Sequence, residues 1–425
     1  MGLIRIELEN LRANPPSKTA VWPALERFLA DMDAGRSGFF HLPARSSWER
    51  ELAAIKPALA HRIPELDTFL HLGIGGSSLG AETIVRALGA SRAPAFHFFN
   101  NIDPDWILHT LERVSPHKAL LYVVTKSGGT METLAQFAFL RQWLESRLGK
   151  ERARNHVVFC TDPSKGDLRA LALEWKIPTF EIPPSLGGRF SALSAVGLFP
   201  ALVAGIDGAR LLKGASDYRK RFLEQVEKSE IPDALSLASM LVDHARKNGR
   251  AMTVLMPYSQ RLKTLSAWFT QLWAESLGKN GHGLTPIAAT GATDQHSILQ
   301  LLRDGPQDKT VGFVEVKGFD QTFDIQWHDP TLPAFDLLNG VTMNQLMDAE
   351  LGATRQVLTN GARPHFTIVL PRLSAHTLGQ TLYFLELLTA LTGYLLEIDP
   401  FGQPGVEEGK ILTKQRIVAA KRKLN

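Results

Sequence analysis

The sequence has only one cysteine among 425 residues, and this scarcity excludes several classes of protein. Cys160 alone cannot form a disulfide framework, nor a cysteine-based zinc site within one chain. It ends an apolar run, Val157–Phe159, so we interpret it as a core residue and not as a nucleophile. No HExxH-type spacing of histidines and carboxylates is present either. We therefore expect no metal, no cofactor and a cytoplasmic location.

Long uninterrupted apolar runs and strong charge imbalance are also missing. The longest apolar stretch, 378–398, is interrupted by polar residues such as Gln380 and Glu386, which predicts a buried helix and not a membrane span. The first residues, 1–7, mix charged and apolar side chains and lack the pattern of a signal peptide. The net charge is only +4, with basic residues clustered in the last helix as a solvated face. We expect neither a membrane nor a nucleic-acid partner.

What is present is an alternation of apolar strand patterns and helical patterns, which is typical of α/β folds with mainly parallel sheets flanked by helices. Strands are predicted in two groups: 68–74, 95–99, 119–124, 157–161 and 179–182, then 251–256, 286–289, 311–316 and 366–370. No repeat or low-complexity tract appears. We predict a helical N-terminal segment, two doubly wound α/β domains and a C-terminal helical arm, at 1–50, 51–206, 207–397 and 398–425.

Two loops with small residues follow predicted strands and precede predicted helices. The first is Gly73-Ile74-Gly75-Gly76-Ser77-Ser78-Leu79-Gly80. Bare backbone N–H groups, the helix dipole and serine hydroxyls favour an anion at such a position. The Rossmann spacing fails because Ser78 stands where the third glycine belongs, so a dinucleotide is the weaker interpretation. A tight turn without a ligand is the alternative.

The second loop, Thr125-Lys126-Ser127-Gly128-Gly129-Thr130-Met131-Glu132-Thr133, combines four hydroxyls, one ammonium and two glycines. It is not a Walker A loop, because its lysine precedes the glycines. A single phosphate monoester fits it better than a nucleoside triphosphate. The alternative is a helix cap with Thr130 at the N-cap position, and such a cap can coexist with ligand binding.

Further segments in the same chain make a resemblance specific. They are Gly187-Gly188-Arg189-Phe190-Ser191, the helical run 271–279, the segment 291–297 and the C-terminal segment 399–410. Together with the two loops, they resemble the glucose-6-phosphate isomerase family of the sugar-isomerase (SIS) fold over about residues 73–410. The chain is similar in its compact length to bacterial-type members. The resemblance implies two SIS-type domains and a glycolytic and gluconeogenic aldose-ketose isomerase.

Such a reaction moves a carbonyl between C1 and C2 of an opened sugar, which requires a base and stabilisation of the enediolate. The resemblance implies that Glu275 is the base and that Arg189 stabilises the enediolate. It also implies that His296 and Lys410 act in ring opening. From the residues alone, Glu275 could instead pair with Lys279 on an exposed helix, Arg189 could be a solvent-facing loop residue, and His296 could be structural.

The resemblance assigns the remaining substrate contacts to the loops and to the C-terminal segment: Gly76, Ser77, Thr125, Lys126, Ser127, Thr130 and Gln403. It also implies a homodimer in which the histidine matching His296 comes from the neighbouring subunit. Two alternatives stay open. One is another SIS-fold isomerase, acting for example on mannose 6-phosphate. The other is a non-catalytic sugar-phosphate sensor, which would not need Glu275, His296 and Lys410 together.

Overall fold

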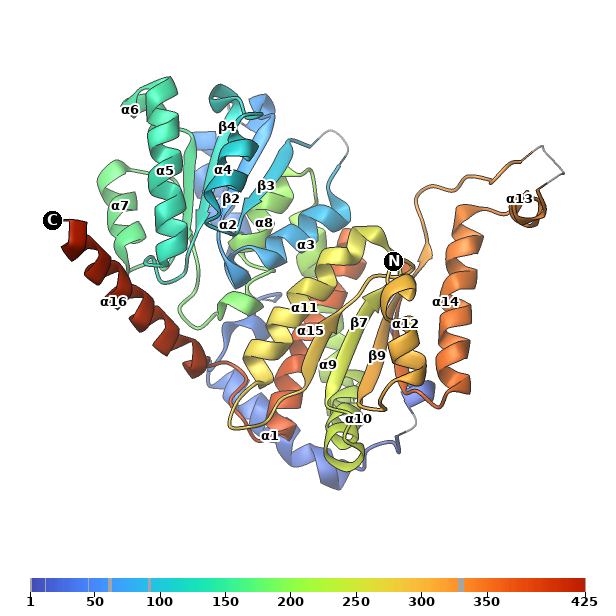
Figure 1. Ribbon diagram of the computed structural model, residues 1–425. Helices are drawn as coiled ribbons and strands as arrows, with labels where there is room; N and C mark the ends of the chain where they lie inside the picture. The colour runs from blue at the N-terminus through green and yellow to red at the C-terminus, as the bar shows by residue number, and fades with distance from the viewer. Residues whose placement is uncertain are drawn as a thin grey trace.

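The computed structural model describes residues 2–11, 13–44, 46–59, 63–90, 93–327 and 332–424. Two five-stranded sheets form the centre of the fold, and helices cover their faces (Figure 1). Helix α11 (Lys263–Leu277) lies between the two sheets (Figure 1). The largest core cluster joins both halves, because it contains Tyr122 from one sheet and Ile368 from the other. The predicted α/β class with parallel sheets flanked by helices is confirmed.

The first sheet is entirely parallel and contains all five strands predicted in the first half of the chain. Phe69 belongs to the core on one face of this sheet and Leu70 to the core on the other, so its strands are buried on both sides. The strand order is β3 (Ala95–Phe99), β2 (Thr68–Leu72), β4 (Ala119–Val124), β5 (Val157–Thr161) and β6 (Thr179–Glu181).

The helices associated with the first sheet begin mostly where strands end. Helix α3 follows the first loop directly, and α5 follows the second. The helices of this half are α2 (Trp48–Leu59), α3 (Leu79–Leu88), α4 (Pro104–Leu111), α5 (Met131–Leu148), α6 (Lys150–Arg154), α7 (Asp167–Trp175) and α8 (Ala195–Val203).

The second sheet contains the four strands predicted in the second half and one that the sequence did not predict. The unpredicted strand, β1, pairs antiparallel with β10 at the sheet edge, with Ile6 opposite Ile368. A segment of three residues is too short to display strand alternation, so only its pairing partner identifies it. The order is β1 (Arg5–Glu7), β10 (His365–Arg372), β9 (Lys309–Gly318), β7 (Met252–Pro257) and β8 (Thr285–Ala288).

Helix α15 is the buried helix expected from the apolar stretch 378–398. It packs along α9 (Gly208–Glu227), which begins just after the domain boundary predicted between residues 206 and 207. No helix in the described part of the chain is long and apolar enough to cross a membrane. The remaining helices are α1 (Lys18–Asp33), α9 (Gly208–Glu227), α10 (Asp233–Asn248), α11 (Lys263–Leu277), α12 (Gln295–Asp304), α13 (Pro333–Leu338), α14 (Met343–Asn360), α15 (Ala375–Leu395) and α16 (Glu407–Leu424).

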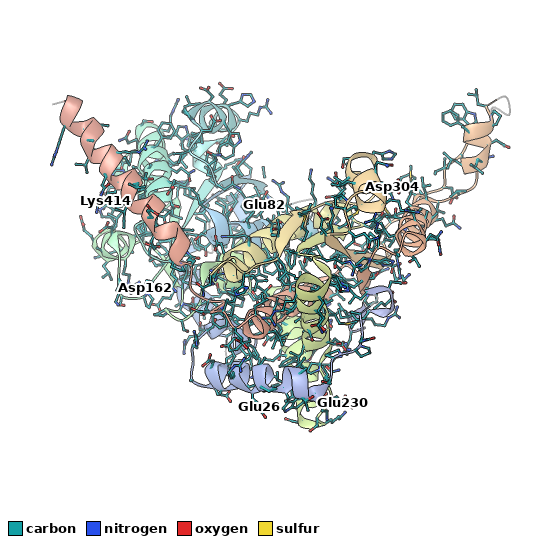
Figure 2. The ribbon with its side chains drawn as sticks, turned by 60° about the horizontal axis from the view of Figure 1, so that its bottom comes forward. Glu26, Glu82, Asp162, Glu230, Asp304 and Lys414 are labelled. Carbon is teal, nitrogen blue, oxygen red and sulfur yellow. The ribbon has the colours of Figure 1, made fainter. Side chains whose placement is uncertain are left out.

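Two elements project from the body of the molecule. Helix α16 extends from one side, and the segment that carries α13 extends from another (Figure 1). Figure 2, in which Lys414 marks α16, shows the same projection from a second direction. The side chains of α16 are exposed as far as residue 422, including the apolar Ile411 and Ile417. The helical C-terminal arm of the sequence prediction is therefore present and makes little contact with its own chain.

Candidate functional site

The two small-residue loops lie at the same edge of the first sheet. Strands β2 and β4 are neighbours and parallel, with Leu72 opposite Val123 at their carboxyl ends. Because each loop directly follows one of these strands, both loops emerge side by side. Ligands of open α/β sheets bind at this edge, beyond the carboxyl ends of the strands. The fold thus places the predicted phosphate-binding loops where such folds bind ligands.

The glycines of the first loop permit close contacts that side chains would prevent. Gly75 has a φ of +58°, and a Cβ added there would lie 2.7 Å from Nε2 of Gln271 on α11. A Cβ on Gly76 would lie only 2.3 Å from the carbonyl carbon of Gly188. The first loop therefore packs directly against both the Gly-Gly-Arg turn and α11, and it brings these two segments together.

Arg189 is the centre of the site. It lies in the 3₁₀ helix Gly188–Phe190 and is only 2% exposed, which excludes the interpretation as a solvent-facing loop arginine. Its guanidinium makes five hydrogen bonds, and these go to Ser276 Oγ, Glu275 Oε2, Gln403 Oε1 and the carbonyl oxygens of Pro400 and Gly402. Five bonds match the five N–H groups of the fork, so the cation is held in one orientation.

The hydrogen bonds of Arg189 differ in length and in the charge of their acceptors. Nε donates to Ser276 Oγ at 2.7 Å, and Nη2 donates to Pro400 O at 2.6 Å. The bond from Nη1 to Glu275 Oε2 is longer, at 3.4 Å. Burial lowers the pKa of Arg189, while the charges of Glu275 and Asp399 oppose that shift. Four of the five acceptors are neutral oxygens, and only Glu275 Oε2 is charged, so much of the positive charge of this dehydrated cation remains available to a ligand anion.

Glu275 lies near the end of α11, where the sequence predicted the base. Its side chain is 30% exposed, so one part faces solvent while the other contacts the protein. Oε1 accepts a hydrogen bond from Gln271 Nε2 at 2.9 Å, one helical turn earlier, and Oε2 faces Arg189. Lys279 does not pair with Glu275, because its Nζ donates to backbone carbonyls instead. The exposed i,i+4 pair that was the alternative interpretation is absent between these two residues.

The second loop is organised by its own hydroxyl groups. Thr125 Oγ1 lies 2.8 Å from Thr130 Oγ1 and 3.4 Å from Ser127 Oγ. Thr130 occupies the N-cap position of α5 but makes no side-chain cap hydrogen bond, so its hydroxyl serves the loop and not the helix. Lys126 Nζ donates to Pro184 O at 2.7 Å, and burial lowers its pKa. Three hydroxyls thus gather at the start of a long helix, while the ammonium of the same loop is held at Pro184.

Among the described residues, no hydrogen bond or ion pair joins His296 or Lys410 to Arg189, Glu275 or the two loops. Asp294 and Gln295 hold the start of α12 through Thr290 N and Tyr258 OH, at 2.7 and 2.8 Å, while His296 is exposed. Lys410 lies on the projecting α16, where its side chain is 58% exposed and pairs with Glu407. One chain therefore unites Glu275, Arg189 and Gln403, but not the two residues expected in ring opening.

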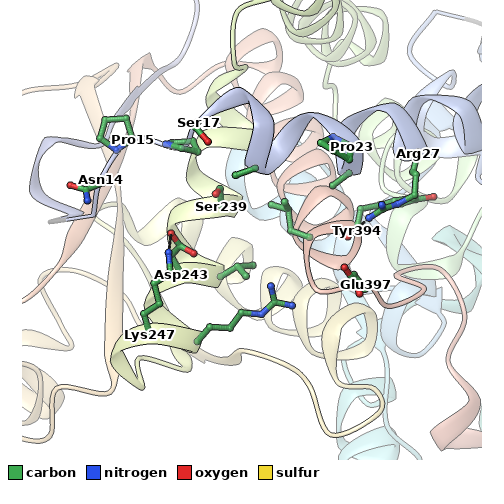
Figure 3. A pocket seen from close by; sticks show the side chains of 16 residues that line it. Asn14, Pro15, Ser17, Pro23, Arg27, Ser239, Asp243, Lys247, Tyr394 and Glu397 are labelled. Carbon is green, nitrogen blue, oxygen red and sulfur yellow. Dashed lines mark hydrogen bonds and ion pairs between the residues drawn. The ribbon is translucent and has the colours of Figure 1, made fainter.

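A separate pocket lies between α1, α10 and the end of α15 (Figure 3). Its volume is about 500 Å³, and its lining includes Arg27, Tyr394 and the ion pair of Asp243 with Lys247. None of the predicted site residues lines it. We therefore place the candidate site at Arg189 and the two loops, and not in this pocket.

Several residues that shape the site were not predicted individually. Gln271, Ser276 and Lys279 all belong to the helical run 271–279, whose resemblance signal covered them without assigning roles. Their spacing was the sequence signal that could have identified them, since residues three and four apart share a helix face with Glu275 or with one another. Their contacts with segments more than eighty residues away could not be read from that spacing.

The chain is similar in sequence and in fold to known proteins. A family model described as "Phosphoglucose isomerase" matches residues 60–423. The glucose-6-phosphate isomerase of Carboxydothermus hydrogenoformans is 40% identical over 92% of this chain and 87% of its own. That of Rubrobacter xylanophilus is also 40% identical, over 98% of this chain and 95% of its own.

Solved structures show the same fold. A hypothetical protein from Thermus thermophilus superposes with a TM-score of 0.90 at 36% identity, covering 98% of this chain and all of its own. A glucose-6-phosphate isomerase from Chlamydia trachomatis gives a TM-score of 0.81 at 23% identity, covering 98% of this chain and 89% of its own. With the family model spanning most of the sequence, the chain belongs to the phosphoglucose isomerase family.

Proposed function

We propose that this chain interconverts glucose 6-phosphate and fructose 6-phosphate. The observation that carries the proposal is the buried Arg189, whose guanidinium touches both the Glu275 carboxylate and the Gln403 amide. A base beside a fixed cation is the arrangement that enediolate chemistry requires. The family membership and the names of the curated relatives support this particular substrate pair. We propose further that this enzyme acts in glycolysis and gluconeogenesis and is located in the cytoplasm.

In the proposed reaction, the Glu275 carboxylate removes the proton from C2 of the open-chain aldose. The electrons of the broken C–H bond form the C1=C2 bond, and the charge develops on the former carbonyl oxygen. Arg189 stabilises this charge, which is greater in the transition state than in the bound substrate. The proton of the C2 hydroxyl passes to the C1 oxygen, and Glu275 returns its proton to C1. The electrons of the C1=C2 bond form the new C1–H bond, and C2 becomes the carbonyl carbon of the ketose. No redox partner is consumed, because one carbon is oxidised as its neighbour is reduced.

The phosphate group is the anchor of the substrate in this proposal. Lys126, Ser127 and Thr130 bind it from the second loop, with Thr125 contributing its hydroxyl. Ser77 of the first loop also binds the phosphate, and Gly76 contributes its backbone, since both loops lie at the same edge of the sheet. Gln403 contacts the substrate beside Arg189. Binding energy from a group that does not react can then position C2 over Glu275.

We also propose a homodimer whose sites combine residues of two chains. The family resemblance suggests that His296 of one subunit completes the site of the other, with Lys410 acting beside it in ring opening. Two features of the chain support this proposal. His296 is directed outward while its neighbours hold the helix start. Apolar side chains are exposed on both projecting elements, for example Ile411 on α16 and Leu337 on α13.

The decisive assay follows glucose 6-phosphate formation from fructose 6-phosphate in a coupled reaction, with mannose 6-phosphate tested alongside. Turnover of the glucose and fructose pair supports the proposal. Turnover of mannose 6-phosphate alone would instead favour another SIS-fold isomerase. Binding of sugar phosphates without any turnover would favour the non-catalytic sensor.

A further inference from the structure

Arg189 depends for its orientation on residues 399–403, which we call the C-terminal strap. Three of the five hydrogen bonds of the Arg189 guanidinium go to the strap. Their acceptors are Pro400 O, Gly402 O and Gln403 Oε1, at 2.6, 3.1 and 2.8 Å. The strap joins the buried α15 to the projecting α16. A shift of the strap would therefore move the acceptors that hold the cation.

The strap is internally ordered by one carboxylate. Asp399 Oδ1 accepts a hydrogen bond from Phe401 N at 2.9 Å, and Oδ2 accepts one from Gly402 N at 3.2 Å. The ring of Phe401 packs near that of Phe190, with centroids 5.6 Å apart. These contacts fix the shape of the strap, but they leave open what holds its first residue to the helix that carries the base.

Lys279 provides that connection. It follows the end of α11, and its Nζ donates to Ser276 O at 2.9 Å and to the backbone oxygen of Asp399. Ser276 is the same residue whose hydroxyl accepts from Arg189 Nε. One ammonium thus links the helix of Glu275 to the first residue of the strap.

We infer that Lys279 is a positioning residue, which clamps the strap to α11 and thereby fixes Arg189 against Glu275. This inference rests on the proposed function. A lysine that only capped its own helix would bond to carbonyls of the last turn. The bond to Asp399, which lies 120 residues further along the chain, extends beyond such a cap.

The charges around Lys279 come from each of the segments that pack there. Burial is the main cause that lowers the pKa of Lys279, to about 8, and the charge of Arg189 acts in the same direction. Asp399 and Glu275 oppose the shift. Placing a second cation beside a buried arginine costs free energy, which the hydrogen bonds of that cation must offset. The location of Lys279 is therefore more costly than that of a solvated lysine.

The chain allows a chemical rescue experiment. Its single native cysteine, Cys160, is fully buried, and burial raises the pKa of its thiol, so it resists alkylation. Lys279→Cys therefore introduces one accessible thiol. Alkylation with 2-bromoethylamine converts that thiol into an aminoethyl thioether, which restores an ammonium at nearly the length of lysine. Iodoacetamide produces a neutral adduct at the same position.

We expect Lys279→Cys to lower kcat about tenfold or more, with KM changed less than about twofold, because the phosphate loops are not altered. Aminoethylation should recover most of kcat, and the neutral adduct should not. Lys309→Met is the matched control. Lys309 is buried, and like Lys279 it donates to a backbone carbonyl, that of Pro306, and it also donates to Asp308 at the amino end of β9. Its loss should leave kcat near the wild-type value.

Three results would overturn the inference: wild-type kcat in Lys279→Cys, equal recovery with both reagents, or an equal loss of kcat in Lys309→Met. Far-ultraviolet circular dichroism of each variant shows whether a loss of kcat comes from misfolding. Recovery of kcat on aminoethylation shows that the variant was folded and that only the ammonium was missing. Wild-type turnover is measured first. If the wild type does not interconvert the two sugar phosphates, the proposed function fails, and that outcome is distinct from failure of the Lys279 inference.

Discussion

His71 makes the stability of this protein sensitive to mild acid. It lies fully buried on β2, directly before the first loop, with its ring centroid 5.2 Å from that of Phe98 and 5.4 Å from that of Tyr122. Nε2 lies 2.7 Å from the carbonyl oxygen of Ser77. A carbonyl oxygen only accepts, so Nε2 carries the hydrogen. Nδ1 has no hydrogen-bond partner among the described residues.

The sign of the effect follows from the protonation states. Burial lowers the pKa of His71 from 6.5 to about 4, and the bond to Ser77 only partly opposes it. Between pH 6.5 and about pH 4, His71 is protonated in the unfolded chain but neutral in the folded chain. The free energy of unfolding therefore falls as the pH decreases from 6.5 towards 4. The full loss corresponds to about 3 kcal/mol, of which about 2 kcal/mol is lost between about pH 7 and about pH 5.

Urea unfolding at about pH 7 and about pH 5 measures this loss in the wild type and in His71→Gln. Glutamine does not titrate, yet its amide can still donate to Ser77 O. We expect the decrease in unfolding free energy on acidification to be about 2 kcal/mol smaller in the variant. His117→Gln, which changes an exposed histidine on the 3₁₀ helix Pro116–Lys118, should behave like the wild type. Equal decreases in the wild type and His71→Gln would refute the reasoning.

Glu275→Gln should retain the fold but lower kcat roughly 10²–10⁴-fold, because the proton acceptor is lost while its size remains. Exchange of the C2 proton with solvent should disappear with turnover, and a variant that still exchanged it at the normal rate would identify another base. Lys126→Ala and Thr130→Ala should mainly raise KM, each by about tenfold, since a charged phosphate loses a donor. Unchanged KM in both would move the phosphate site elsewhere. Glu275→Gln and His296→Ala, refolded as an equal mixture, should recover about a quarter of the wild-type sites if sites are shared across a two-fold dimer. A mixture as inactive as its parents, with hybrid dimers demonstrated, would argue for sites built within one chain. Activity should survive treatment with EDTA, because Arg189 supplies the positive charge at the enediolate, and loss restored by a divalent ion would contradict this.

The parallel strands and the two loops could be predicted from the sequence because their signals are local. Apolar runs such as Leu120–Val124 and Val157–Cys160 are buried on both faces, so they show as continuous apolar segments between helical patterns. Glycines and hydroxyl residues directly after such runs mark strand-to-helix loops with free backbone N–H groups. The short edge strand Arg5–Glu7 lacks any such signal, and the pairing with β10 alone defines it.

The site residues show the same division. Glu275 and Arg189 could be named from motif resemblance, but their separation in sequence carries no information about distance. Arg189 bonds to a carbonyl 211 residues away, and Lys279 to one 120 residues away. Such contacts exist because α11 packs between the two sheets and because Gly76 allows the first loop to touch the Gly188 backbone. Burial of the guanidinium then leaves its donors only protein oxygens, and the folded chain selects which oxygens those are.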